Sequence, residues 1–183
     1  MLTDRIIGAF TFRREVYAEV EKDTSFTSTA WVIVIVVAFL NQLGARASGR
    51  IGQWLMGAII GTAFAVAAFA LAAFIISWVG KQLFHAEVDF SEMVRTLGLA
   101  YVWNVVGVIG ILSVFSAALT CVLSPALVLA AVLGFVSWLL ATKEALDLEW
   151  GQTIVTVVIG MIISWVVTLI AGVFLGLLGI AAG

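Results

Sequence analysis

Charged residues are scarce in this sequence. Lys and Arg number 9 and Asp and Glu number 11 among 183 residues, so 11% of the chain is charged while 63% is hydrophobic. A soluble domain has about 25% charged residues, and a chain this apolar cannot bury enough of its surface to stay in water. The composition therefore predicts a polytopic integral membrane protein. The net charge of −2 and the lack of a dense Lys/Arg run exclude nucleic-acid binding.

Cysteine and histidine each occur only once. A lone Cys121 excludes an intramolecular disulfide and a thiolate zinc site. A lone His85 excludes a bis-histidine haem, although one imidazole could ligate a pigment magnesium or a haem with another sixth ligand. The alternative is an interfacial loop histidine without a function. No cofactor is predicted, and a bound lipid, quinone or pigment is compatible with the sequence.

Long apolar runs predict an all-α bundle of five transmembrane helices, because a helical crossing needs about 20 apolar residues. The stretch from Leu97 to Thr142 has no charged residue. As one helix it would span roughly 65–70 Å, about twice the hydrocarbon core, so it must hold two crossings. We place its turn before Pro125, with Ser124 as N-cap, because proline is favoured at the first helical position. The expected membrane domain covers residues 29–183, with crossings at about 30–43, 51–79, 101–120, 125–141 and 153–180.

Charge segregates to one side of this topology. The N-terminal tail and the connections after the second and fourth crossings hold seven of the nine Lys/Arg residues and all eleven Asp/Glu residues, leaving only Arg46 and Arg50 opposite. The positive-inside rule then places the N-terminus in the cytoplasm and the C-terminus outside. Arg46 and Arg50 could hold a lipid phosphate, or they could be ordinary flanking charges.

None of the five expected crossings contains an ionisable side chain. Such groups mark proton relays, ion pathways and intramembrane catalysis, so their absence disfavours a pump, a coupled transporter or an enzyme. Small residues are instead the most regular feature. Gly160, Ser164, Gly172 and Gly176 fall on one face of the last crossing, and Gly57 and Gly61 fall on one face of the second. This spacing predicts close helix packing, with a dimer face or a lipid groove as alternatives.

Residues 1–28 are predicted to form an amphipathic cytoplasmic helix and linker, with apolar residues at roughly helical spacing: Leu2, Ile6, Phe10, Val16, Tyr17 and Val20. This helix should either lie on the membrane interface or pack on the protein's own cytoplasmic loops. Further along, the spacing of Asp89 and Glu92 predicts a capping box and a helix that starts near Phe90.

Three polar stretches carry a family resemblance. The segments DRIIGAFTFRREVYAEVEKDTSFTSTAW, FSEMVRTLGLA and KEALDLEWGQTIVTVVIG resemble, in this order and spacing, bacterial members of the Yip-domain family of Ypt/Rab-interacting proteins. The resemblance implies five membrane helices, a cytoplasmic N-terminus, the bacterial plasma membrane, and a role in membrane organisation or partner binding. Eukaryotic relatives carry a long polar N-terminal extension linked to Rab partners, which is replaced here by the short amphipathic helix, so Rab binding is not implied.

Three functions fit these expectations. The first is a non-catalytic scaffold or adaptor whose cytoplasmic cap binds a cytoplasmic protein partner. The second is an accessory subunit of a larger respiratory or photosynthetic membrane complex, which packs beside lipid, quinone or pigment and other membrane-protein subunits. The third is a carrier of apolar or lipid-like cargo. Membrane lipids are expected neighbours in all three.

Overall fold

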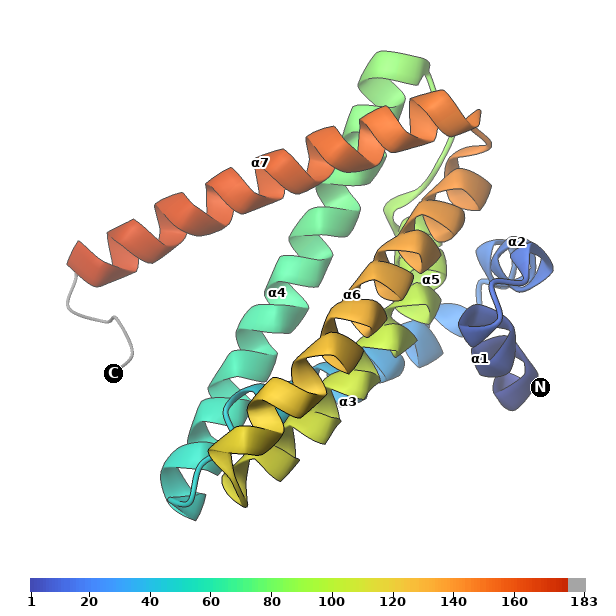
Figure 1. The fold of residues 1–183 in the computed structure, drawn as a ribbon. Coiled ribbons are helices and arrows are strands. Elements are labelled where there is room, and N and C mark those ends of the chain that lie inside the picture. Colours follow the sequence, from blue (N-terminus) through green and yellow to red (C-terminus); the bar gives the residue numbers. More distant parts are fainter. Residues whose placement is uncertain (178–183) are drawn as a thin grey trace.

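The computed structural model describes residues 1–177 and, within them, all side chains except those of residues 117, 164, 165 and 167–177. All regular structure in this part of the chain is helical (Figure 1). The elements are α1 (Leu2–Phe10), α2 (Arg14–Lys22), α3 (Phe26–Ala45), α4 (Ile51–Phe84), α5 (Phe90–Ala100), the 3-10 helix η1 (Tyr101–Val114), α6 (Ala117–Leu146) and α7 (Trp150–Leu177).

Four helical stretches are long and apolar enough to cross a membrane. These are α3, α4, the continuous stretch formed by α5 and η1, and α6. Helix α7 is a fifth apolar helix of 28 residues. The expected all-α fold of an integral membrane protein is therefore confirmed. Length and hydropathy make four of the five expected crossings candidate membrane spans in the described part of the chain.

The turn between the third and fourth crossings is not where the sequence suggested. Helix η1 ends at Val114, and α6 begins at Ala117 and runs without a break to Leu146. The side chain of Ser116 accepts a hydrogen bond from the backbone N–H of Ala118, so Ser116 is the N-cap. The expected boundaries 101–120 and 125–141 are thus wrong by several residues.

Pro125 lies inside α6 rather than at its start. A proline lacks the N–H that would bond to the carbonyl of Cys121 one turn earlier. The hydroxyl of Ser124 donates to that carbonyl at 2.9 Å and so supplies the missing bond. This local compensation lets the helix continue through the proline.

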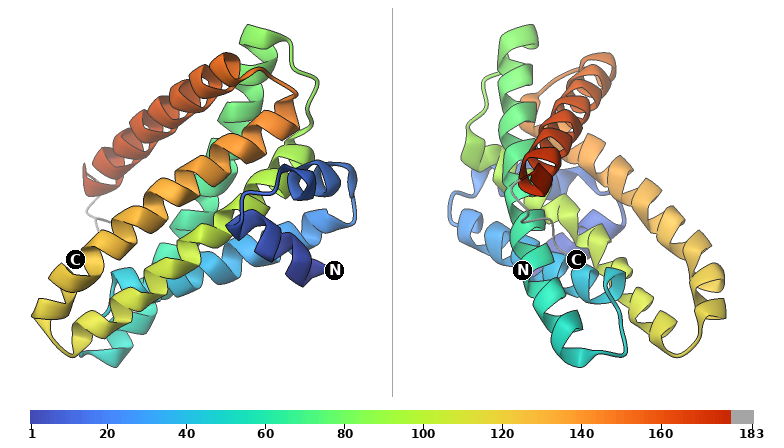
Figure 2. Two further views of the ribbon diagram at one scale, coloured as in Figure 1. Left: turned by 45° about the vertical axis from the view of Figure 1, so that its right-hand side comes forward. Right: turned by 90° about the vertical axis from the view of Figure 1, so that its left-hand side faces the viewer.

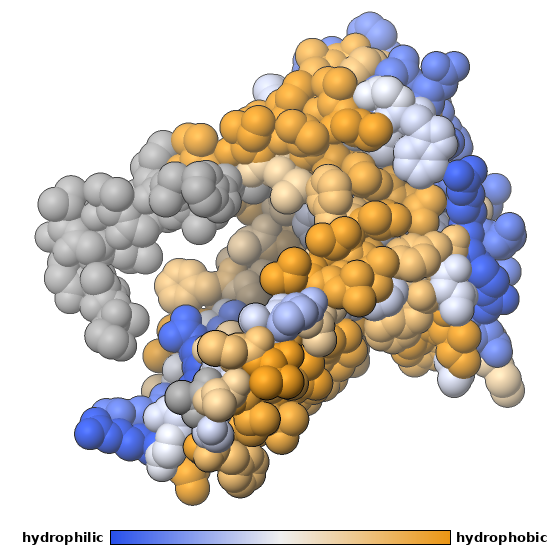
Figure 3. Space-filling view, viewed as in Figure 1, coloured by the Kyte–Doolittle hydropathy of each residue, from blue (hydrophilic) through white to orange (hydrophobic). Residues whose placement is uncertain are grey.

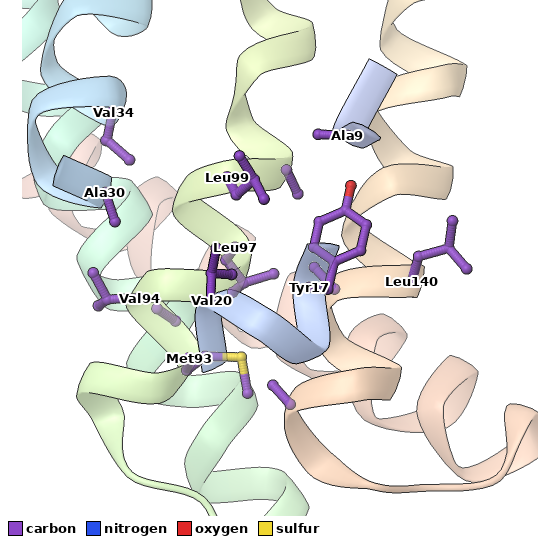
Figure 4. Close-up of a cluster of buried hydrophobic side chains, with 14 of the residues drawn as sticks. Ala9, Tyr17, Val20, Ala30, Val34, Met93, Val94, Leu97, Leu99 and Leu140 are labelled. Carbon is purple, nitrogen blue, oxygen red and sulfur yellow. The ribbon is translucent and has the colours of Figure 1, made fainter. Parts of the chain in front are cut away.

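The N-terminal amphipathic segment forms two helices instead of one. The chain breaks at Phe12, whose φ of 57° lies in the left-handed region, and α1 and α2 form a hairpin. The apolar face of α2 is buried against α5 and α6, with Tyr17 fully buried between them (Figure 4). Of the two predicted arrangements, the structure has the one in which this segment packs on the protein itself. Its partners are the ends of membrane helices rather than loops.

Polar residues gather at one end of the bundle. The hairpin lies beside α5 and α6 at the end where α4 stops and α7 starts (Figure 1, Figure 2). Hydrophilic residues follow that edge of the surface, apolar residues cover the middle, and a second small hydrophilic patch lies at the opposite end (Figure 3). We name residues 1–25, 81–95 and 143–150 the polar cap.

Candidate functional site

Arg95 anchors the polar cap. This α5 side chain is 3% exposed, and its Nε donates to the carbonyls of Val20 and Glu21, both at 2.9 Å. Nη2 also donates to Glu21, and Nη1 reaches the hydroxyl of Thr27 at 3.3 Å. The last carbonyls of any helix lack intrahelical partners. Arg95 thus caps the C-terminal end of α2 and holds the hairpin on the bundle.

Ion pairs also close the hairpin onto the start of α3. Arg5 Nη1 lies 2.8 Å from Asp23 Oδ2, Arg5 Nε lies 3.7 Å from Glu19 Oε2, and the guanidinium carbon stands 5.0 Å from the ring centroid of Phe26. Hydrogen bonds from Ser25 and Arg5 lower the pKa of Asp23 below its usual range. The aspartate is therefore ionised at neutral pH, which keeps the ion pair intact.

The cap segment 143–150 meets the hairpin at Trp150. The guanidinium carbon of Arg14 lies 5.2 Å from the centroid of the Trp150 ring, and the ammonium of Lys143 lies 5.8 Å from it. Burial raises the pKa of Glu21, and the nearby charges of Asp147 and Glu92 raise it further. Side chains from all three segments therefore share one electrostatic surface.

This surface carries excess negative charge. The polar cap holds all 11 acidic residues and 7 of the 9 basic ones, so its formal charge is 7 − 11 = −4. Five of the basic residues already contact groups within the protein: Arg5, Arg13, Arg14, Arg95 and Lys143. Exposed carboxylates come from all three segments, at Glu15, Glu87 and Glu149. The cap would therefore attract a basic surface more strongly than an anionic membrane.

Tyr17 and Trp103 connect the cap to the membrane helices. The hydroxyls of Tyr17 and Ser137 on α6 lie 2.6 Å apart, and burial raises the pKa of Tyr17 to about 12. The indole of Trp103 on η1 stacks on Phe12 with ring centroids 5.5 Å apart and meets Phe10 edge-on at 5.0 Å. The hairpin thus rests directly on the start of η1.

Beyond Trp103, a cavity of about 480 Å³ lies between α3, η1 and α6. Its wall has no charged side chain, and its aromatic end is formed by Tyr101, Trp103, Phe135 and Trp138. The remaining lining residues are Asn41, Gly44, Ala45, Asn104, Gly107, Gly110, Leu127, Ala130, Ala131, Gly134 and Met161.

The 3-10 geometry of η1 decides which residues face α3. With 3.0 residues per turn, side chains at i and i+3 eclipse. Tyr101, Asn104, Gly107 and Gly110 follow this spacing and all line the cavity. The two glycines let α3 approach closely, because a Cβ on Gly110 would stand 2.8 Å from the carbonyl oxygen of Gly44.

Two asparagines supply the polar groups of the cavity. Asn41 Nδ2 donates to the backbone carbonyl of Asn104 at 2.9 Å, and Asn104 Nδ2 donates to that of Tyr101 at 3.2 Å. A carbonyl only accepts, so these contacts fix which end of each amide is the NH2 group. Among the described residues, no donor reaches the amide oxygen of either asparagine.

The predicted site residues of the second crossing lie beside the predicted phosphate ligand. Gly57 faces the side chain of Arg46, and Gly61 faces those of Gln42 and Arg46, where an added Cβ would stand 2.8 Å from Arg46 Nε. Arg46 Nε also donates to Gln42 Oε1 at 2.9 Å. These glycines therefore make room for an arginine side chain. Arg50 is exposed at the start of α4.

The predicted stripe of the last crossing is described in part. Gly160 packs on α4, where an added Cβ would stand 2.6 Å from Ile76 Cγ1. The side chain of Ser164 and the surroundings of Gly172 and Gly176 lie outside the described residues. His85 is exposed, with a φ of 55°, and caps the C-terminus of α4. It does not line the cavity, and no group of three His, Cys, Asp or Glu side chains in the described part of the chain could hold a metal ion.

The sequence did not predict Arg95 as the anchor of the polar cap or the η1 residues that line the cavity. Arg95 was counted only as one of the charges on its side of the membrane, because nothing local distinguishes a buried arginine from a solvated one. Tyr101, Asn104, Gly107 and Gly110 recur every three residues, whereas the small residues of the predicted packing faces recur at α-helical spacing. This three-residue period was the signal in the sequence that could have predicted a 3-10 helix and its cavity-lining face.

Comparison with known proteins gives one family. The model of the Yip1 domain matches residues 7–174, which is nearly the whole chain. The comparisons with curated proteins and with solved structures give no match.

Proposed function

The chain belongs to the Yip1 domain family, which is linked to membrane trafficking and is generally non-catalytic, and on this basis we propose that it is a membrane adaptor whose polar cap binds a soluble protein partner. The observation that carries this proposal is the construction of the cap. Three segments far apart in sequence converge there, held by Arg95 and by the cation contacts around Trp150. Solvation alone would keep charges outside the bilayer, but it would not require them to share one ordered surface.

The proposed partner presents a basic surface, because the cap has a formal charge of −4.

We further propose that α7 makes a fifth crossing, which places the cap on the cytoplasmic side of a bacterial plasma membrane. Seven of the nine Lys/Arg residues support this orientation. Arg46 and Arg50 then face the exterior, near lipid phosphates.

Cysteine labelling tests the orientation. Single cysteines at Ser25, Glu87 and Glu149, in a Cys121→Ala background, should react with a membrane-impermeant maleimide only after the membrane is opened. All three positions are exposed. Cysteines at Gly49 and Phe115, which are exposed at the opposite end, should react in intact cells. Labelling of Glu149→Cys from the same side as Gly49→Cys would disprove the five-crossing topology.

Partner capture tests the adaptor function. We expect a protein to copurify with the tagged chain in mild detergent and to be lost when Glu15, Glu87 and Glu149 are changed together to Ala. An electrostatic contact should also weaken as salt rises from about 50 to 300 mM, because the Debye length shortens. The control is the double variant Arg46→Ala and Arg50→Ala, which removes exposed charges of the opposite sign at the opposite end.

The alternatives give different outcomes. Recovery of other membrane subunits in fixed stoichiometry, unaffected by the cap variant, would favour an accessory subunit of a larger complex. Capture that is equally lost in the Arg46 and Arg50 control would contradict binding through the cap.

The cavity between α3, η1 and α6 favours a second function, in which the bundle holds a lipid-like molecule.

A further inference from the structure

We propose that the cavity between α3, η1 and α6 binds an uncharged lipid that carries a free hydroxyl group, with diacylglycerol as the specific occupant. This inference rests on the cavity alone and does not depend on the partner proposed for the cap. A volume of about 480 Å³ lies within the range of pockets that hold small molecules. It is large enough for a glycerol group and the upper part of an acyl chain.

The polar groups of the cavity select a hydrogen-bond donor. The amide NH2 groups of Asn41 and Asn104 each donate a hydrogen bond to a backbone carbonyl. Their amide oxygens keep their acceptor capacity, since no donor in the described part of the chain reaches them. Both asparagines are partly exposed and line the cavity, so their amide oxygens can accept a hydrogen bond from the hydroxyl of a ligand.

The absence of charged side chains from the cavity wall favours a neutral ligand. No Lys, Arg, Asp, Glu or His is among the lining residues. A phosphate or carboxylate placed there would lose its hydration without gaining a cation, which costs far more than one hydrogen bond returns. Phospholipids and free fatty acids are therefore disfavoured, and a lipid alcohol is favoured.

The apolar wall suits an acyl chain. Leu127, Ala130 and Ala131 lie on α6, and Phe135 and Trp138 continue this wall toward the polar cap. The glycines at 107 and 110 of η1 also line the cavity and add no side-chain volume there. The cavity thus combines a narrow polar wall with an apolar one, as an amphiphile requires.

Photocrosslinking tests this assignment. The full chain in phosphatidylcholine vesicles is illuminated with a diacylglycerol that carries a diazirine in one acyl chain, and labelled peptides are read by mass spectrometry. We expect labelling around Leu127–Phe135, competed by unlabelled diacylglycerol. The same probe with its hydroxyl methylated should label about five- to tenfold less, because one donated hydrogen bond is lost. The phosphatidic acid probe with the same chains should label no better than background.

A pair of neighbouring variants locates the site. Ala131→Phe places a ring in the cavity and should reduce labelling about tenfold, the cost of excluding the bound chain. Val132→Phe is the matched control, because Val132 is 54% exposed and does not line the cavity. Circular dichroism and monodispersity check that both variants fold, and the probe comparison on the wild-type chain stands even if one does not. Equal labelling by the three probes, no labelling, or labelling that Ala131→Phe leaves intact would overturn the proposal.

Discussion

Replacing Arg95 by methionine is expected to release the α1–α2 hairpin from the membrane bundle. Methionine fills similar space but donates no hydrogen bond, so the carbonyls of Val20 and Glu21 would lose their partner while remaining covered. Hydrogen bonds from a charged donor contribute about 1.5–3 kcal/mol each, and stranded buried acceptors add to the loss. We expect docking of the hairpin to weaken by about 3 kcal/mol or more.

Hydrogen exchange provides the measurement. A loss of about 3 kcal/mol corresponds to roughly a hundredfold faster exchange of the α2 amides, if they exchange through undocking. Arg95→Lys should be intermediate, since one ammonium keeps the charge but cannot reach both carbonyls and Thr27 in the same geometry. Arg50→Met, at the exposed start of α4, is the control and should leave α2 unchanged. Unchanged exchange in Arg95→Met would contradict the anchoring function.

The second large effect is expected at the contact between α3 and η1. A Cβ added to Gly44 would overlap the carbonyl oxygen of Gly107 and stand 3.1 Å from the Cα of Val108. The obstacle is backbone, so no side-chain rotation relieves it and the two helices must separate. We expect Gly44→Ala to destabilise the bundle by about 3 kcal/mol, the upper end of ordinary overpacking.

Gly52→Ala is the matched control, because a Cβ at Gly52 meets nothing within 4 Å. It lies in the first turn of α4, where alanine is intrinsically better than glycine in a helix. The midpoint of thermal unfolding in detergent should therefore fall clearly for Gly44→Ala and stay the same or rise slightly for Gly52→Ala. Equal midpoints for both variants would show that α3 and η1 do not touch at this glycine.

Local signals in the sequence predicted what local chemistry determines. The capping box at Asp89 and Glu92 is present, with both of its hydrogen bonds, and α5 begins at Phe90 as expected. The start of α4 after Arg50 was also predicted correctly. In the capping box, side chains bond to backbone groups three residues away, so the pattern contains its own cause.

Helix α6 begins eight residues before the start that Pro125 predicted, so a local signal was misleading here. Proline at the first helical position is a sound preference, yet Ser124 compensates for Pro125 within the helix and Ser116 supplies a stronger start eight residues earlier. The burial of Arg95 and the 3-10 winding of η1 depend on contacts between distant segments. Composition and periodicity carry no information on which carbonyls an arginine will reach.

The contacts that hold the hairpin also set the order in which the protein is completed. Arg95 lies 75 residues after Val20, and Ser137 lies 120 residues after Tyr17. At a synthesis rate of about 5–20 residues per second, the hairpin waits roughly 6–24 s for its last partner to leave the ribosome. The first segment made thus docks only after α6 has been made. During that interval the apolar face of α2 has no protein neighbour, and the adjacent membrane surface is where such a face shelters until α6 arrives.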